Sequence, residues 1–414
     1  MAVRETLIEA CAAAPDDDAP RLVLADAIGG ERGEFIVVQC ALAQGRRSPA
    51  EAGALRRRQR ELVAAHGVAW SGLAGLAKRV TFRRGFVDAA ELDARTVALR
   101  AEAIVAAAPL LRHVMLSGMI TRGREFAPAP PADPLIALGD ALARPELRRL
   151  HGLRFDSIGT LYDSDVYGMP PMYEGREGPA IRRALDAGVL AGMRSFAAPR
   201  VDAATVQALI ASGQLAGVER LHSQLSAADT LAVVAHLPRL AALELEDLRL
   251  APAELPATLV ELHVAGADLW GLADLPLAGR LERLTLEQSQ IRHDPWRLAA
   301  FTRLRTLHLS ELAPSYHADE KQVAARFAAL SLPALREVCA SGLTTAAALA
   351  LAQRFGPQLE LLDLRGSTSE LHARRGELAA LVAGEVRTGA WEQPRELAFL
   401  GGPPLDATLV ELPR

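Results

Sequence analysis

The chain has 414 residues, of which 50% are hydrophobic and only 4% are aromatic, and its formal net charge is -4. This length exceeds what one compact core usually reaches, and the charge excludes a general electrostatic attraction to nucleic acid or to an anionic membrane. Three scattered cysteines exclude a disulfide framework and a zinc-binding spacing. We therefore expect a cytoplasmic protein without a membrane-spanning segment, a cofactor or a bound metal.

The first 67 residues predict a small helical module. Apolar residues recur at helical spacing in four segments, and Pro15 ends the first of them. Asp18, the last of three consecutive aspartates, is placed to cap the second helix. The helices expected in this module are Leu7–Ala12, Arg21–Ile28, Gly33–Ala43 and Glu51–His66.

Three runs in this module, followed by a fourth further on, carry a resemblance. They are Leu7-Ile-Glu-Ala10, Pro15-Asp-Asp-Asp-Ala-Pro-Arg-Leu-Val-Leu-Ala-Asp26, Glu31-Arg-Gly-Glu-Phe-Ile-Val-Val-Gln39 and Phe82-Arg-Arg-Gly-Phe-Val87. Together they resemble the repeat-companion domain of bacterial proteins. The likeness is specific over about Leu7–Ala43 and looser to about Ile120. It implies a bacterial protein with a helical module before leucine-rich-repeat-like units, and it implies no particular activity.

Strand-like and helix-like segments then alternate as far as His236. Such alternation is typical of a parallel sheet whose strands are connected through helices. The strands expected are Val80–Val87, Leu111–Leu116, Leu147–Phe155, Met193–Ala197 and Gly217–Leu221. The helices expected between them are Ala94–Ala107, Leu135–Ala143, Pro179–Leu190, Val206–Ala211 and Leu231–His236.

A leucine-x-x-leucine-x-leucine pattern then repeats six times. The copies are Leu240–Leu245, Leu259–Val264, Leu281–Leu286, Leu304–Leu309, Leu335–Ala340 and Leu359–Leu364, and their starts are 19, 22, 23, 31 and 24 residues apart. This spacing is close to the period of leucine-rich repeats, about 20–29 residues. The asparagine of the repeat consensus is missing, so regular helices such as Gln322–Leu330 and Thr345–Phe355 are expected on the convex side.

The predicted fold class is α/β. We expect a leucine-rich-repeat-like horseshoe solenoid with a parallel concave sheet and convex helices, preceded by the helical module. The domains would be residues 1–67 for the repeat-companion module, 68–390 for the irregular solenoid and 391–414 for a C-terminal cap or the last strands, including Thr408–Leu412.

The side chains that alternate with the repeat leucines predict a polar concave surface. It would carry Glu244, Glu246, Glu261, His263, Arg283, Glu287, His308, Glu337, Asp363 and Arg365. Acids predominate, so we expect a protein or peptide partner, and a basic one is favoured. The segment 156–178 is a second candidate surface, because its residues Tyr162, Tyr167 and Tyr173 are of a type enriched at interfaces. Non-catalytic recognition by a sensor or adaptor scaffold is the predicted function.

Two alternatives remain open. In the first, His308 and Cys339 belong to an unrecognised enzyme, since His308, Cys339 and Asp363 occupy the same position of three consecutive repeats. The order argues against it, because Asp363 would flank the thiol rather than the imidazole and would raise the thiol pKa. No familiar catalytic motif occurs. In the second, the helical module recruits the partner and the solenoid is a rigid spacer.

Overall fold

The computed structural model describes most of the chain. The described residues are 2–45, 47–117, 139–155, 178–199, 201–245, 255–265, 276–287, 295–310, 320–389 and 407–413. They form two compact units. Unit 1 comprises residues 1–45, 56–239 and 394–414, and unit 2 comprises residues 46–55 and 240–393.

The fold is mixed α/β, and the described residues contribute seven strands to each unit. In unit 1 the strand order is β14-β1-β2-β3-β4-β5-β6; the two pairs that involve β1 are antiparallel and the remaining pairs are parallel. These strands are β1 (Ala77–Arg83), β2 (Phe86–Asp93), β3 (His113–Ser117), β4 (Gly152–Phe155), β5 (Ser195–Ala198), β6 (Arg220–Ser223) and β14 (Ala407–Glu411).

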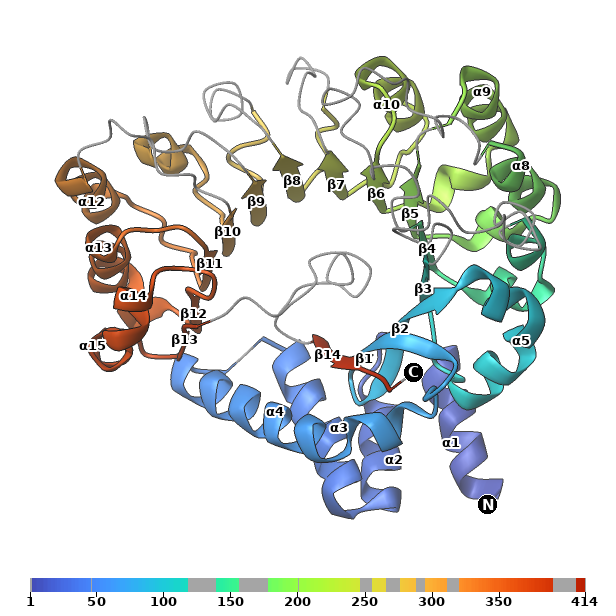
Figure 1. Ribbon diagram of the computed structural model, residues 1–414, viewed down its shortest axis with the longest axis horizontal. Helices are drawn as coiled ribbons and strands as arrows, with labels where there is room; N and C mark the ends of the chain where they lie inside the picture. Colours follow the sequence, from blue (N-terminus) through green and yellow to red (C-terminus); the bar gives the residue numbers. More distant parts are fainter. Residues whose placement is uncertain are drawn as a thin grey trace, which may run out of the picture. The chain divides into compact units, whose positions relative to one another are not determined.

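Helices of unit 1 fall into two groups. The first group is α1 (Ala2–Ala13), α2 (Ala19–Ile28), α3 (Gly30–Ala43) and the part of α4 (Pro49–Ser71) from residue 56 onward. The second group is α5 (Ala94–Ala107), η1 (Pro145–Arg149), α8 (Gly178–Asp186), η2 (Val189–Gly192), α9 (Ala203–Ser212), η3 (Gln214–Gly217) and α10 (Ala227–Val234). In Figure 1, α8, α9 and α10 lie on one side of the strands β4 to β6.

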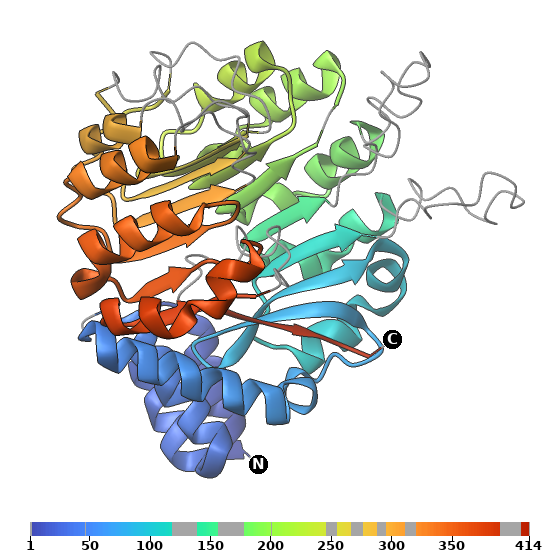
Figure 2. The ribbon, with the colours of Figure 1, turned by 60° about the vertical axis from the view of Figure 1, so that its left-hand side comes forward.

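Unit 2 repeats a simpler pattern of parallel strands with helices on one side. Its strands are β7 (Ala242–Leu245), β8 (Glu261–Ala265), β9 (Arg283–Glu287), β10 (Thr306–Ser310), β11 (Glu337–Ala340), β12 (Leu361–Asp363) and β13 (Glu385–Arg387). The helices are η5 (Pro295–Ala300), α12 (Glu320–Ala329), α13 (Thr345–Phe355), η6 (Gly356–Gln358), α14 (Ser369–Ala373) and α15 (Arg375–Leu381). Figures 1 and 2 show α12, α13 and α15 beside the strands β10 to β13.

Buried leucines explain the register of unit 2. One row across the strands contains Leu243, Leu262, Leu284, Leu307, Val338, Leu362 and Val386, each opposite the next. All of them are buried. A slip of one residue would turn an entire strand's apolar set to the other face, so this row fixes the pairing. The strands of the six predicted repeats are confirmed. The two helices expected in this region are confirmed as well, α13 with the predicted bounds and α12 within two residues of them.

Residues 80–87 depart from the sequence prediction. We expected one strand there, but the chain forms an antiparallel hairpin between β1 and β2. The reason lies in the turn, where Arg84 has φ 49° and Gly85 has φ 87°. Positive φ at both central residues is the geometry that joins two antiparallel strands with the correct twist. The prediction was wrong because an Arg-Gly pair is a weaker turn signal than Asn-Gly.

Gly85 also anchors the helical module to the hairpin. Its N–H donates to Gln39 Oε1 at 2.6 Å, and a Cβ at this position would lie 2.4 Å from Ile36 Cγ1. Aromatic rings complete the contact: the centroid of Phe35 is 5.6 Å from that of Phe82 and 5.2 Å from that of Trp70. The predicted helices of the module are confirmed, and this packing holds α3 against β1.

The C-terminal strand β14 pairs antiparallel with β1, so that Val410 lies opposite Val80. Thr408–Leu412 was expected to be a strand, and this is confirmed within one residue at each end. None of the helices that the structure describes combines the length and the apolar composition needed to cross a bilayer.

Candidate functional site

Polar residues of unit 2 form two aligned rows, which we call the ladder face. The first row is Glu244, His263, Thr285, His308, Cys339, Asp363 and Arg387; the second contains Glu261, Arg283, Thr306, Glu337 and Glu385. Neighbouring strands in a sheet are about 4.8 Å apart, so successive members of a row can interact. The predicted alignment of His308, Cys339 and Asp363 is confirmed.

Burial of the ladder face differs from the expectation of a solvated surface. Glu337 is 1% exposed, Asp363 is 2% exposed and Glu244 is 7% exposed. His263 and Arg283 are half-buried. Sequence alternation shows which face of a strand a residue occupies, but it does not show what covers that face. The most buried acids are therefore poor candidates for direct contact with a partner.

Most acids of the ladder face have basic neighbours. Arg283 donates to Glu261 Oε2 from Nη2 at 2.6 Å and from Nε at 2.9 Å. His263 Nδ1 lies 3.4 Å from Glu244 Oε1. Arg283 therefore offsets the negative charge of Glu261, and His263 offsets that of Glu244 only when its imidazole is protonated.

Two arginines surround Asp363 at the end of the ladder face. Arg365 binds its carboxylate through Nε at 2.9 Å and Nη2 at 2.5 Å, and Arg387 Nη1 lies 3.8 Å away. Arg387 also donates to Glu385 Oε1 at 2.7 Å. Glu385 and Arg387 were missed from the sequence because β13 lacks the leucine pattern; the alternation Glu-Val-Arg was the available signal.

The thiol of Cys339 does not have the properties of a nucleophile. Burial, and then the negative charges of Asp363 and Glu337, raise its pKa well above the ordinary value. A thiol needs an electropositive, partly exposed environment to ionise at neutral pH. The direction predicted from the order His308, Cys339, Asp363 is confirmed.

Several predicted site residues lie outside the described residues. These are Glu246, Tyr162, Tyr167 and Tyr173, together with nearly all of the segment 156–178. Glu287 lies at the end of β9, but its side chain is not among those described.

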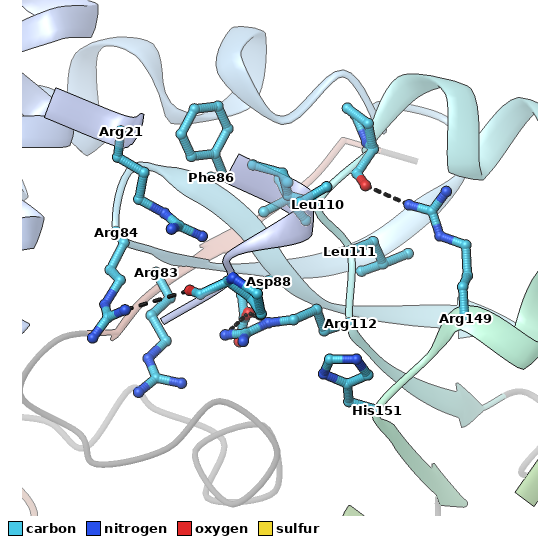
Figure 3. Close-up of a pocket in the computed structure, with 14 residues that line it drawn as sticks. Arg21, Arg83, Arg84, Phe86, Asp88, Leu110, Leu111, Arg112, Arg149 and His151 are labelled. Atoms are coloured by element: carbon cyan, nitrogen blue, oxygen red, sulfur yellow. Dashed lines mark hydrogen bonds and ion pairs between the residues drawn. The ribbon is translucent and has the colours of Figure 1, made fainter. Parts of the chain in front are cut away.

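A second candidate site, missed by the sequence analysis, is a pocket of about 240 Å³ in unit 1, which we call the arginine pocket. Its polar lining is Arg21, Arg83, Arg84, Asp88, Arg112, Arg149 and His151. Figure 3 shows these residues around the pocket; they come from α2, from the β1–β2 hairpin and from the segments that lead into β3 and β4. No repeat or motif links them, because their separation in sequence reaches 130 residues between Arg21 and His151.

The most buried arginine of the pocket, Arg21, is held by backbone carbonyl groups. Arg21 Nη1 donates to the carbonyl oxygens of Ala14 at 3.2 Å and Asp17 at 2.7 Å, where the chain leaves α1. Its side chain is buried, and its Nε has no hydrogen-bond partner among the described residues. Burial lowers the pKa of Arg21, and the nearby positive charges of Arg84 and Arg112 lower it further.

Two more arginines bind aspartates. Arg112 Nε donates to the buried Asp88 Oδ1 at 2.6 Å. Arg84 Nε lies 3.3 Å from Asp18 Oδ1. Asp18 stands at the N-cap of α2 as expected, but its side chain makes no capping hydrogen bond; Asp17 Oδ1 instead accepts from the N–H of Ala19 at 2.9 Å. The carboxylate of Asp18 thus faces Arg84.

Asp16 lies between two of these arginines. One of its oxygens is 3.6 Å from Arg112 Nη1 and 3.9 Å from Arg84 Nη1, and its side chain is 62% exposed. Both distances are too long for a hydrogen bond. The negative charge is therefore attracted by two guanidinium groups without being fixed by either.

Within the described part of the chain, no group of three or more His, Cys, Asp or Glu side chains could hold a metal ion. Comparison of the sequence with protein-family models gives no match, and no curated protein matches it either.

Proposed function

We propose that this protein is a non-catalytic recognition scaffold, a sensor or adaptor that binds a protein or peptide partner on the ladder face. In this proposal the chain is a cytoplasmic bacterial protein in which a repeat-companion module precedes a leucine-rich-repeat-like horseshoe solenoid. The observation that carries it is the alignment of polar side chains across seven parallel strands of unit 2.

Rigid placement of charges supports recognition rather than catalysis. Each strand is fixed by a buried leucine or valine, and Arg283 and Arg387 of the ladder face are further held by Glu261 and Glu385. Charges that are held in place before binding lose little conformational freedom when a partner docks, and they favour a partner with complementary charges. Since both signs are present, the matching surface would also carry both.

The accessible part of the ladder face defines the experiment. Glu261 and Arg283 are half-buried and paired, so they can be exchanged in charge without placing a new charge in the core. Glu282 and Arg303 form a 3.1 Å pair in unit 2 that is not on the ladder face, and they provide a matched control. A partner would be captured from native lysate, purified, and titrated against Arg283→Glu, the double exchange Glu261→Arg/Arg283→Glu, and the control Arg303→Glu.

We expect at least a tenfold loss of affinity for Arg283→Glu, incomplete recovery for the double exchange, and less than a twofold change for Arg303→Glu. Equal affinity in all folded variants would refute recognition by the ladder face. Loss of binding on deletion of Met1–Gly67, with no effect of Arg283→Glu, would instead favour the alternative in which the helical module recruits the partner and the solenoid is a rigid spacer.

The enzyme alternative that uses His308 and Cys339 is less well supported, because the raised thiol pKa leaves little thiolate at neutral pH. Cys339→Ser should leave any partner-dependent activity unchanged. Loss of such an activity in the folded variant would restore that alternative.

A further inference from the structure

Positive charge is in excess in the arginine pocket. Five arginines line it and Asp88 is the acid in its lining. Arg112 is neutralised by Asp88 and Arg84 by Asp18, whereas the hydrogen bonds of Arg21 go to uncharged carbonyl groups. A buried guanidinium without a counter-ion is costly. Arg21 is also close enough to Arg84 and Arg112 for their positive charges to lower its pKa, so an anion held between those two residues would offset the uncompensated charge of Arg21 as well.

Asp16 marks the place where an anion can lie. Its carboxylate oxygen stands near Arg84 and Arg112 without hydrogen bonding to either. Guanidinium groups bind carboxylate and phosphate oxygens best at about 2.7–2.9 Å, often in pairs. An external anion at this point could reach distances that the tethered carboxylate does not, and the exposed Asp16 side chain could turn into solvent to admit it.

The rest of the pocket is apolar. Its remaining lining is Ala12, Pro15, Phe86, Val87, Pro109, Leu110 and Leu111. A benzene ring occupies a cavity of about 150 Å³. The pocket of about 240 Å³ therefore has room for a ring-sized apolar body in addition to a charged group. Ligand sites commonly combine such an apolar lining with a few convergent polar groups.

We propose that the arginine pocket binds a small organic anion. Its carboxylate or phosphoryl oxygens lie between Arg84 and Arg112, and its apolar body packs against Phe86, Leu110 and Leu111. This site belongs to unit 1 alone. It is independent of the ladder face, so either proposal can fail without the other.

Ligand chemistry can be tested by calorimetric titration of the full-length protein with four probes: phenyl phosphate, benzoate, inorganic phosphate and phenol. We expect phenyl phosphate or benzoate to bind at least tenfold more tightly than both inorganic phosphate and phenol. The tighter of the two tells whether the anionic group is phosphoryl or carboxylate. Absence of binding by both would overturn the proposal, and so would inorganic phosphate binding as tightly as phenyl phosphate.

Arg84→Asn is the variant that removes a guanidinium with least risk to the fold. Arg84 has a positive φ in the hairpin turn, a conformation that asparagine adopts more readily. We expect its affinity for the tighter probe to fall at least tenfold. The exposed Arg95, at the opposite end of β2, supplies the control Arg95→Gln, which should change affinity less than twofold. Equal affinities for Arg84→Asn and Arg95→Gln would overturn the assignment.

Asp16→Asn should raise the affinity for the anion, in contrast to Arg84→Asn, which should lower it. Removing the internal carboxylate takes away a competitor for the two guanidinium groups, so affinity should rise about threefold to tenfold. If Asp16 only supported the fold, its removal would leave affinity unchanged or lower it, and the proposed position of the anion would be wrong. Circular dichroism and thermal unfolding of each variant would establish that it is folded.

Discussion

His113 should make unit 1 sensitive to mild acid. The side chain lies in β3, 3.8 Å from Asp88 Oδ2, and is 8% exposed. Burial lowers its pKa from 6.5 to about 4; the Asp88 charge opposes this shift, whereas Arg112, Arg83 and His151 add to it. Between these two pH values the unfolded chain binds a proton at this residue and the folded protein does not. Lowering the pH therefore favours the unfolded state.

The size of the effect follows from the two pKa values. From pH 7.5 to pH 5, proton binding by the unfolded state alone lowers the free energy of unfolding by about 2 kcal/mol. Near pH 4 the loss approaches about 3 kcal/mol, since each unit of pKa difference corresponds to about 1.4 kcal/mol. The stability that depends on a neutral His113 is therefore fully present above pH 6.5, and it is lost as the pH falls toward 4.

Urea unfolding between pH 4.5 and 7.5 would measure this pH dependence of the free energy of unfolding. Trp70 would be the fluorescent reporter of unit 1 after the other three tryptophans are replaced by Phe. Trp70 stacks on His66 and contacts Phe35, so its emission should change on unfolding. His113→Gln and His113→Phe cannot titrate, and they should lose about 2 kcal/mol less than the wild type between pH 7.5 and 5. An identical pH dependence in the wild type and both variants would refute the assignment to His113.

Three further predictions concern stability and reactivity. Gly85→Ala should lower the free energy of unfolding by about 3 kcal/mol or more, because the new Cβ would lie 2.4 Å from Ile36 Cγ1 at a residue with positive φ. The control Gly188→Ala, also at a residue with positive φ but with open space around it, should lower the free energy of unfolding by only about 1 kcal/mol. Comparable costs in urea unfolding would show that the packing against α3 is loose. Asp363→Asn should cost about 3 kcal/mol, because it leaves two partly buried arginines without their shared carboxylate; a loss below about 1 kcal/mol would argue against that network. Cys339 should resist iodoacetamide at pH 8 until the protein unfolds, and rapid alkylation of the folded protein would contradict its burial and raised pKa.

Repeated local patterns could be interpreted from the sequence, because alternation along a strand depends on the residues within that strand. The spacing of leucines in Leu240–Leu245 and its five counterparts located six strands and their buried faces. It also located the row containing His308, Cys339 and Asp363, and from that row the direction of the thiol pKa shift followed. The helices of the N-terminal module were found for the same reason, since helical periodicity and proline positions are local signals.

Burial of the ladder face could not be predicted in this way. A glutamate on the polar side of a strand is predicted to be exposed to solvent, yet Glu337 is almost completely buried. The exposure of a side chain depends on the neighbours that surround it, and these come from other strands. The identity of its charge partners, such as Arg387 beside Asp363, has the same origin.

The sequence by itself determined that this chain forms parallel strands from a leucine repeat, together with an N-terminal set of helices. Tertiary structure alone decided that Arg84 and Gly85 make a hairpin turn packed against α3, that β14 pairs with β1, and that arginines from α2 to η1 meet around one pocket. The physical reason is the distance along the chain over which each effect acts. Hydrophobic period and turn chemistry act over a few residues, whereas pairing of distant strands and convergence of charges depend on how the whole chain packs.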